Sequence, residues 1–318
     1  MNAVVQTPSQ QVPARSTARS VEAAGDGTFS TYGISPLRHN FQDHPLMQIP
    51  RLAELAHALL PTQQCRFIVP GSEVGSKFEH KPQRHDGRGL DEFFGRIEEP
   101  GSWIALYNVQ TDPAYAEFLR EVTESARHLI EPQQPGMFGV GGFIFISAPP
   151  SVTPFHIDRE NNLWLQIRGR KIINVWDHRD RKVVASADVD EFIVSGGLDN
   201  VRLKDGFLER SQEFNVGPGD GVYFPATSPH MTRTTTEWVK PGDGVSISIG
   251  VVFYTPHTYR QATIHSMNQM LRRRLKIEPR PPNPTGRGDL LRSLISRAYV
   301  WVLRKVRGHK LNKGLSLP

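Results

Sequence analysis

Residues 153–171 read TPFHIDRENNLWLQIRGRK, a strand-like stretch that contains a His-x-Asp tripeptide. Side chains two positions apart along a strand lie on the same face of a sheet. His156 and Asp158 therefore point to one side, while Phe155 and Ile157 point to the other. We predict that one face of this strand enters an apolar core and that the other face carries two groups able to bind a metal.

A second His-x-Asp occurs at His178 and Asp180, within the charged run DHRDRK (177–182). Short motifs of this kind arise by chance, and a lone His-x-Asp is more often a hydrogen-bonded structural pair than a metal site. Because the run follows the apolar strand-like segment KIINVW (171–176), it is typical of a solvated turn. We expect this second pair to be inert.

A third metal-binding residue can come from NVGPGDGVYFPATSPHMT (215–232), which reads as a Pro-Gly-Asp turn, a short strand, a Pro break and then His230. Two His and one carboxylate on one face of a metal form the facial triad of non-haem Fe(II) oxygenases. Such a triad leaves positions open for a co-substrate and O2. His156, Asp158 and His230 are therefore the candidate ligand set.

The rest of the chain indicates a mainly β protein with flanking helices. From Gly139 onward, short apolar runs alternate with Gly, Pro, Asn and Asp, and many short strands with frequent turns predict a sandwich or a barrel. A double-sheet jelly roll is one option. Apolar residues at helical spacing mark the flanking helices, at 50–60, 89–102, 113–132, 259–275 and 289–306.

Composition divides the 318 residues into four regions. Residues 1–35, rich in Ser, Gln, Ala and Pro, are expected to be a disordered tail. Residues 36–137 are expected to form a helical or mixed region packed on a β core at 138–256, with a mobile substrate loop at 72–88. Residues 257–318 carry 14 Lys and Arg against two acidic residues, a net charge of +12, whereas the residues before them carry 24 against 30, a net charge of −6.

The single cysteine, Cys65, excludes an intramolecular disulfide and fits a reducing compartment. No apolar run approaches the ~20 residues of a transmembrane helix. We therefore expect a cytoplasmic protein, with peripheral membrane contact as an alternative.

Taken in order, seven elements of the sequence resemble the jumonji-C (JmjC) hydroxylases of the cupin superfamily, and among them the asparaginyl hydroxylases of the hypoxia-inducible factor. These elements are Thr-Pro, His-x-Asp, Asn, Gln-Ile, Gly-x-Lys, Pro-Gly-Asp and a distal His. The resemblance covers roughly residues 100–256 and is strongest over 153–176. It implies a double-stranded β-helix (jelly-roll, cupin) core for 138–256. It also implies a dioxygenase, a hydroxylase that uses Fe(II), 2-oxoglutarate and O2.

The resemblance also implies roles for individual residues. His156, Asp158 and His230 match the iron ligands. Lys171 matches the lysine that binds the distal carboxylate of 2-oxoglutarate through a charge-assisted hydrogen bond. Three further positions match polar residues of the same co-substrate pocket, namely Thr153, Asn162 and Tyr107. Trp164, on the Asn162 face of the strand, is expected to be a core residue rather than a wall of the substrate site.

Two departures from the pattern concern the substrate. Gly250, in SISIGVVF (246–253), falls where the asparaginyl hydroxylases have an asparagine beside the co-substrate. Thr227, Ser228 and Pro229 replace the aromatic residues that precede the distal His in those enzymes. Neither change affects the residues that match the iron ligands. The substrate of the asparaginyl hydroxylases, however, does not carry over to this chain.

The resemblance therefore implies hydroxylation of an unactivated C–H bond, with a protein side chain as the first expectation for the substrate. A small molecule or a lipid-linked sugar is an alternative, and so is a non-oxygenase, metal-binding cupin that regulates or senses. The last helix places Leu, Ile, Val and Trp at helical spacing among several Arg and Lys. The resemblance implies a second copy of the chain as its first partner, followed by an anionic membrane, with nucleic acid the least favoured. Packing against the acidic core of the same chain is a further alternative.

Overall fold

The structure is a computed structural model that describes residues 18–25, 28–68, 88–238 and 244–307. Its strands form an eight-stranded and a four-stranded antiparallel sheet. The strands are β1 (Val21–Ala23), β2 (Ser35–His39), β3 (Cys65–Ile68), β4 (Trp103–Leu106), β5 (Phe138–Ser147), β6 (Ser151–His156), β7 (Asn161–Arg168), β8 (Lys171–Val175), β9 (Gln212–Val216), β10 (Asp220–Phe224), β11 (His230–Thr234) and β12 (Ser246–Tyr254).

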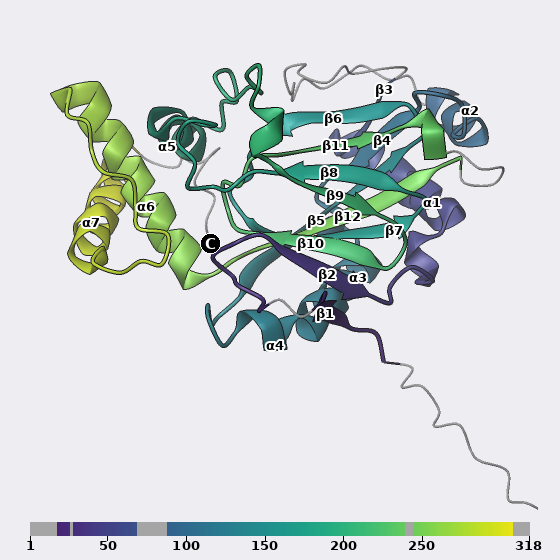
Figure 1. Cartoon of the computed structure of the whole chain (residues 1–318), viewed down its shortest axis with the longest axis horizontal. Helices are drawn as coiled ribbons and strands as arrows, with labels where there is room; N and C mark the ends of the chain where they lie inside the picture. The colour runs from purple at the N-terminus through teal and green to yellow at the C-terminus, as the bar shows by residue number, and fades with distance from the viewer. Residues whose placement is uncertain (1–17, 26–27, 69–87, 239–243, 308–318) are drawn as a thin grey trace, which may run out of the picture.

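Strands β5 to β12 make up a jelly roll. Strands β5, β12, β7 and β10 lie side by side in the larger sheet, whereas β6, β11, β8 and β9 form the smaller one, so the chain crosses repeatedly from sheet to sheet. Figure 1 shows the smaller sheet lying over the larger, and apolar side chains of both sheets meet between them. This double-stranded β-helix order confirms the mainly β fold with flanking helices.

Successive side chains of β7 point to opposite faces of the larger sheet and so enter two different apolar cores. Trp164 packs between the sheets with Ile173 and Phe224. Leu163 and Leu165 point the other way, into a second core that lies under the N-terminal helices. Those helices are α1 (Ile49–Leu59), α2 (Arg88–Gly95), α3 (Pro113–Ser125) and α4 (Arg127–Ile130), and their contributions to this core include Leu52, Leu90, Phe118 and Ile130.

Helix α5 (Ser186–Ser195) lies beside one end of the smaller sheet, as Figure 1 shows, and shares an apolar core with it. Phe155 and Ile157 lie in this core together with Phe192 of the helix. Phe155 and Ile157 therefore lie away from the intervening His156, as predicted, and the His156 side chain faces the cavity between the sheets.

The expectation of a disordered tail over 1–35 is wrong for the part that the structure describes. Strand β1 pairs with β2, and β2 pairs with β10, so this segment extends one edge of the larger sheet. Strands β3 and β4 extend the opposite edge beside β5. The region 36–137, expected to be helical or mixed and to pack on the core, thus supplies strands as well as helices. Residues 1–17 and most of the predicted substrate loop at 72–88 lie outside the described ranges.

Two helices follow the jelly roll. α6 (Pro256–Met270) begins at a capping box, in which Thr255 and Thr258 each satisfy the backbone N–H of the other, and α7 (Leu290–Arg307) packs against it. Figure 1 shows this pair at the side of the barrel, next to α5. Among the described residues, no helix is long and apolar enough to cross a membrane.

A buried ion cluster joins α5 to α6. Asp190 of α5 is fully buried, and its carboxylate contacts His265 Nδ1 at 2.6 Å and Arg272 Nε at 2.9 Å. Arg272 lies in the π-helical turn 271–275 that continues α6, and it also pairs with Glu278. A buried carboxylate is retained only where such partners satisfy it. The cluster therefore fixes α6 on α5.

The pH dependence of stability offers a test of how the end of β2 contacts β7, through the buried His39. His39 at the end of β2 is buried. Its Nε2 donates to the carbonyl of Gln166 at 2.9 Å, while Nδ1 accepts from the Phe41 N–H at 3.1 Å. Burial lowers the pKa of His39 to about 4 from its ordinary 6.5. Because the unfolded chain then binds the proton more readily, the free energy of unfolding should fall as pH drops from 6.5 toward 4.

The contribution of His39 is expected to reach about 1.4 kcal/mol per pH unit over that window. Replacing His39 with Gln keeps a donor for Gln166 but removes the titrating group, so the loss of stability on acidification should become shallower. Urea unfolding at a series of pH values measures both slopes. Equal slopes in the parent and in H39Q would contradict the interpretation.

Candidate metal centre and cavity

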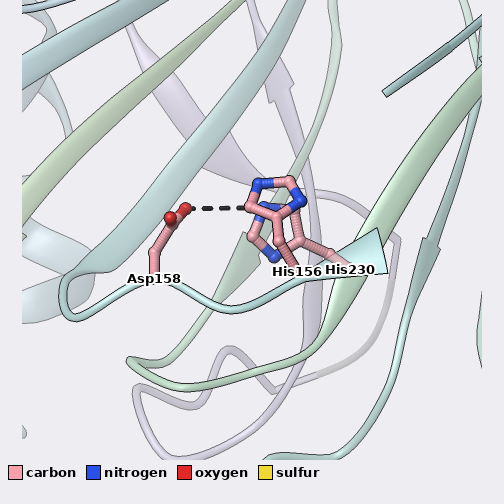
Figure 2. A group of neighbouring side chains, drawn as sticks. All are labelled: His156, Asp158 and His230. Carbon is pink, nitrogen blue, oxygen red and sulfur yellow. Dashed lines mark ion pairs between the residues drawn. The ribbon is translucent and has the colours of Figure 1, made fainter. Parts of the chain in front are cut away.

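Three side chains meet at the open end of the smaller sheet. His156 ends β6 and His230 begins β11, and the two residues are direct partners in the antiparallel pairing. The register shifts just after His230, and such irregularities are common beside active sites. Asp158 lies in the turn that follows β6. Ligand-type atoms of the three residues lie within 4.8 Å of one another. Figure 2 shows the three side chains close together, with Asp158 facing the imidazole rings.

Backbone carbonyls orient both imidazoles. His156 Nδ1 lies 2.7 Å from the carbonyl of Pro154, and His230 Nδ1 lies 3.0 Å from the carbonyl of Ser228. A carbonyl can only accept, so each Nδ1 carries the proton and each Nε2 presents a lone pair. The Nε2 atom of His230 faces Asp158 Oδ2 at 3.4 Å. The hydrogen bond from Nδ1–H to a backbone carbonyl is the usual way in which a protein orients a metal-binding histidine, and it leaves Nε2 to face the metal position beside Asp158.

Burial keeps His230 in the form that a cation needs. His230 is buried, and this burial lowers its pKa to about 4, so the ring is neutral near pH 7. Two neutral imidazoles and one carboxylate suit a divalent first-row transition metal. Within the part of the chain that the structure describes, this is the cluster of His, Cys, Asp and Glu whose ligand atoms come close enough for a metal.

A cavity of about 110 Å³ opens beside the three residues, between the two sheets. Its volume is well below the ~300–1,000 Å³ of clefts that enclose drug-sized ligands, so it suits a small molecule. Aromatic rings form much of the wall, and six of the seven residues singled out from the sequence also line it. The lining consists of Tyr107, Phe143, Phe145, Thr153, His156, Asp158, Asn162, Trp164, His230, Thr232 and Gly250.

Lys171, the seventh residue, is buried between the sheets. It shares the inward face of β8 with Ile173. Its Nζ contacts Ser248 Oγ at 3.4 Å, and Ser248 is two positions from the cavity residue Gly250 on β12. Among the described residues, no carboxylate lies within ion-pair distance of this amine. Burial lowers the pKa of Lys171 to about 7, as expected for a cation that lacks a counter-charge.

Tyr107 and Thr153 occupy the predicted positions at the cavity wall. The Tyr107 ring packs edge-on against Phe143, with 5.7 Å between centroids. Burial raises the pKa of Tyr107 to about 12, so its hydroxyl stays protonated at neutral pH. Thr153 Oγ1 lies 3.4 Å from the indole Nε1 of Trp103, which fixes the end of β6 against β4.

The glycine at position 250 has a steric reason. A Cβ placed on Gly250 would lie 3.2 Å from both amide atoms of Asn162, which is tighter than ordinary van der Waals contact. The Asn162 side chain thus occupies the space above Gly250, and its Oδ1 is buried without a hydrogen-bond partner among the described residues. An asparagine at 250 would therefore not fit without displacing Asn162.

The second His-x-Asp stands apart from this site, and one expectation about it is wrong. His178 is buried rather than solvated, and burial lowers its pKa to about 4. Asp180 instead forms an ion pair with Arg210 and accepts a hydrogen bond from the Lys182 N–H at 3.1 Å. Neither residue belongs to the metal-type cluster.

Several residues of the site were missed or misjudged in the sequence. Trp164 is both a core residue and a wall of the cavity, contrary to expectation. Arg66 on β3 stacks over the Tyr107 ring, with its guanidinium carbon 4.9 Å from the ring centre. Its Nε and Nη1 atoms are buried without hydrogen-bond partners among the described residues. A charged residue inside the apolar run QCRFIVP was the only signal for it.

Arg159, next to Asp158, connects the metal-type cluster to α5. Its Nη2 donates to the carbonyl of Phe192 at 2.8 Å and its Nε to that of Ile193 at 3.2 Å. Both carbonyls belong to the last turn of α5, and that of Phe192 also accepts from the Gly196 N–H at 2.8 Å. The turn that carries Asp158 is thereby attached to the end of α5.

No family model matches the chain, and no curated protein matches it. Among solved structures, it is similar to YcfD from Escherichia coli, described as a ribosomal oxygenase, at 16% identity over 80% of this chain and 58% of that one, with a TM-score of 0.38. A second YcfD structure gives 16% identity, 87% and 66% coverage and a TM-score of 0.42. A third YcfD structure, in complex with cobalt and 2-oxoglutarate, gives 16% identity over 67% of this chain and 49% of that one, with a TM-score of 0.33.

The chain spans between about half and two thirds of the length of these YcfD chains. At such low similarity, the fold assignment rests on the strand order of this chain itself.

Proposed function

We propose that this protein is an Fe(II)- and 2-oxoglutarate-dependent oxygenase that hydroxylates an unactivated C–H bond. The observation that carries the proposal is the presence of two features between the same two sheets. A His-Asp-His cluster lies at the edge of a small cavity, and a buried lysine without a carboxylate partner lies farther along the same interior. A metal site alone fits many proteins, whereas the two together fit a ligand that chelates a metal at one end and carries a carboxylate at the other.

The residues fit Fe(II). His156 and His230 offer Nε2 atoms, and Asp158 offers a carboxylate that cancels part of the charge of the metal. Three protein ligands on one side leave the other coordination positions for small molecules. When bound there, Fe(II) and 2-oxoglutarate supply the oxidative decarboxylation that gives succinate and CO2 and transfers one oxygen atom of O2 to a C–H bond.

The residues around the cavity also fit 2-oxoglutarate. A carboxylate beside Lys171 would restore the counter-charge that this buried amine lacks. The Tyr107 hydroxyl remains a hydrogen-bond donor at neutral pH because burial raises its pKa to about 12. The rings of Phe143, Phe145 and Trp164 exclude water from the cavity and thereby strengthen each of these polar contacts.

The size of the cavity bears on the substrate. A volume of about 110 Å³ suits one small dicarboxylate, so the group to be hydroxylated has to reach the metal from the mouth. A side chain presented by a protein meets this condition, and we infer this class of substrate. A small molecule or lipid-linked sugar held at the mouth is the alternative.

Removing free space at Gly250 should weaken co-substrate binding. In G250A the new methyl group meets the Asn162 amide, and overpacking of a rigid site costs about 1–3 kcal/mol. We expect an approximately tenfold higher Kd for 2-oxoglutarate with unchanged metal affinity, measured by calorimetry. Shortening the neighbour, in G250A/N162S, should restore part of the space. Unchanged 2-oxoglutarate affinity in G250A would show that the ligand lies elsewhere.

Anaerobic titration of the Fe(II)-loaded protein with 2-oxoglutarate tests the proposed function. Chelation of the metal by the 2-oxo acid produces a weak visible charge-transfer band. The proposal expects this band in the parent, its loss in H156A, and succinate formation once O2 is admitted. Bound iron without a band would favour the regulatory, non-oxygenase cupin. A protein that binds no iron would make the His-Asp-His cluster a structural one.

A further inference from the structure

Helix α7 packs on the molecule with its less apolar side. Ser293, Ser296 and Val300, spaced three to four residues apart, are buried, and Ser296 Oγ contacts Met267 Sδ of α6 at 3.5 Å. The larger apolar side chains of α7 point away from that contact and are 47–70% exposed. They are Leu290, Leu291, Leu294, Ile295, Trp301 and Val302. We call these six residues the α7 face.

The α7 face is continuous and does not belong to the core. Its residues recur at helical spacing over most of the 18 residues of α7. Leu275 and Ile277, at the end of α6, add two more exposed apolar side chains, at 57% and 49%. Isolated exposed apolar residues are ordinary, but a contiguous set of this size marks a surface that something else covers.

The charge around the α7 face is almost purely positive. The two acidic residues of the C-terminal region are both neutralised by ion pairs, Glu278 with Arg272 and Asp289 with Arg292. Other cations nearby are exposed and form no ion pair with an acidic residue of the described ranges. They are Arg274, Lys276, Arg287, Arg297 and Lys305.

We propose that the α7 face binds an anionic lipid surface, with the helix lying in the interface. An apolar stripe flanked by Lys and Arg is the pattern of such helices. Trp301 is 59% exposed, and Lys305 lies over its ring at 5.0 Å, so an apolar ring and an ammonium group lie together, as they do at the headgroup level. The charge disfavours a second copy on this face, since two basic surfaces would meet. This proposal stands independently of the proposed chemistry.

Co-sedimentation of the full chain with vesicles tests the proposal. One set of vesicles contains phosphatidylcholine alone, and the other also contains phosphatidylglycerol. We expect binding to the anionic set only, weakened by added salt, which screens exposed charges. The triple variant L291S/L294S/I295S should lose binding. Replacing Arg297 or Lys305 with Gln should lower the partition coefficient about fivefold for each cation removed.

The exposed pair Lys182 and Arg202 provides a matched control for R297Q/K305Q, because K182Q/R202Q removes the same two positive charges from another surface. This control should bind vesicles as the parent does. Equal binding to both vesicle types, or loss of binding in the control, would overturn the proposal. So would a dimer in light scattering that dissociates in L291S/L294S/I295S while neither protein sediments with vesicles. Turnover of 2-oxoglutarate without vesicles separates this proposal from the proposed chemistry, because it should be unchanged in all of these variants.

Discussion

Replacing Asp158 with Asn should lower Fe(II) affinity at least about a hundredfold and remove turnover of 2-oxoglutarate. Loss of a group that only orients a metal ligand costs roughly 10–100-fold, and here a ligand itself loses its charge. The Asn amide keeps the shape of the side chain, so the effect reports on chemistry rather than on packing. Metal titration followed by succinate measurement gives both values.

The second His-x-Asp provides the matched control for that experiment. D180N makes the same substitution in the same tripeptide pattern. Asp180, however, pairs with Arg210 and lies outside the metal-type cluster. We expect D180N to bind Fe(II) as the parent does, with at most a small loss of thermal stability. Equal loss of metal affinity in both variants would mean that neither tripeptide acts as a ligand and that both act through the fold.

Replacing Lys171 with Met should raise the Kd for 2-oxoglutarate by roughly 10- to 150-fold, since a hydrogen bond to a charged group contributes about 1.5–3 kcal/mol. Folding should not suffer, because an unpartnered buried cation is exchanged for an apolar side chain of similar length. Metal affinity should also be unchanged. The exposed Lys182, replaced in K182M, is the control for loss of a lysine, and calorimetry measures all three proteins.

The same lysine predicts a pH dependence. In the free protein the pKa of Lys171 is about 7, lowered by burial. Above that pH the amine is neutral, so a bound carboxylate has to be accompanied by a proton. The apparent affinity for 2-oxoglutarate should therefore fall up to about tenfold per unit of pH above 7. K171M should show no such slope. A flat profile in the parent would place the carboxylate elsewhere.

The sequence was sufficient for the positions that a strand period determines. Phe155 and His156 lie on opposite faces of β6, as that period predicts, whereas Asp158 lies beyond the end of the strand and reaches His156 through the turn that follows it. His230 could be joined to them only through a fold, because its pairing with His156 is a contact between residues distant in the chain.

Other features depend on neighbours that no local pattern reveals. Strand β1 has three residues, and it forms because β2 supplies its hydrogen bonds, so composition alone made it part of a tail. In the sequence, Gly250 reads only as the absence of an asparagine. The structure explains the glycine, because the Asn162 side chain fills the space above it. The burial of His178 within a charged run is likewise a tertiary effect.

The contacts of Arg159 and Asp190 form a mechanical linkage. Arg159 holds the turn of Asp158 to the last turn of α5, and Asp190 of the same helix is bonded to His265 and Arg272 at the far side. The C-terminal helices thus have little freedom to swing as a separate arm. A surface that binds α7 would therefore hold the mouth of the cavity at a fixed orientation and distance. That geometry would limit which groups can reach the proposed metal site.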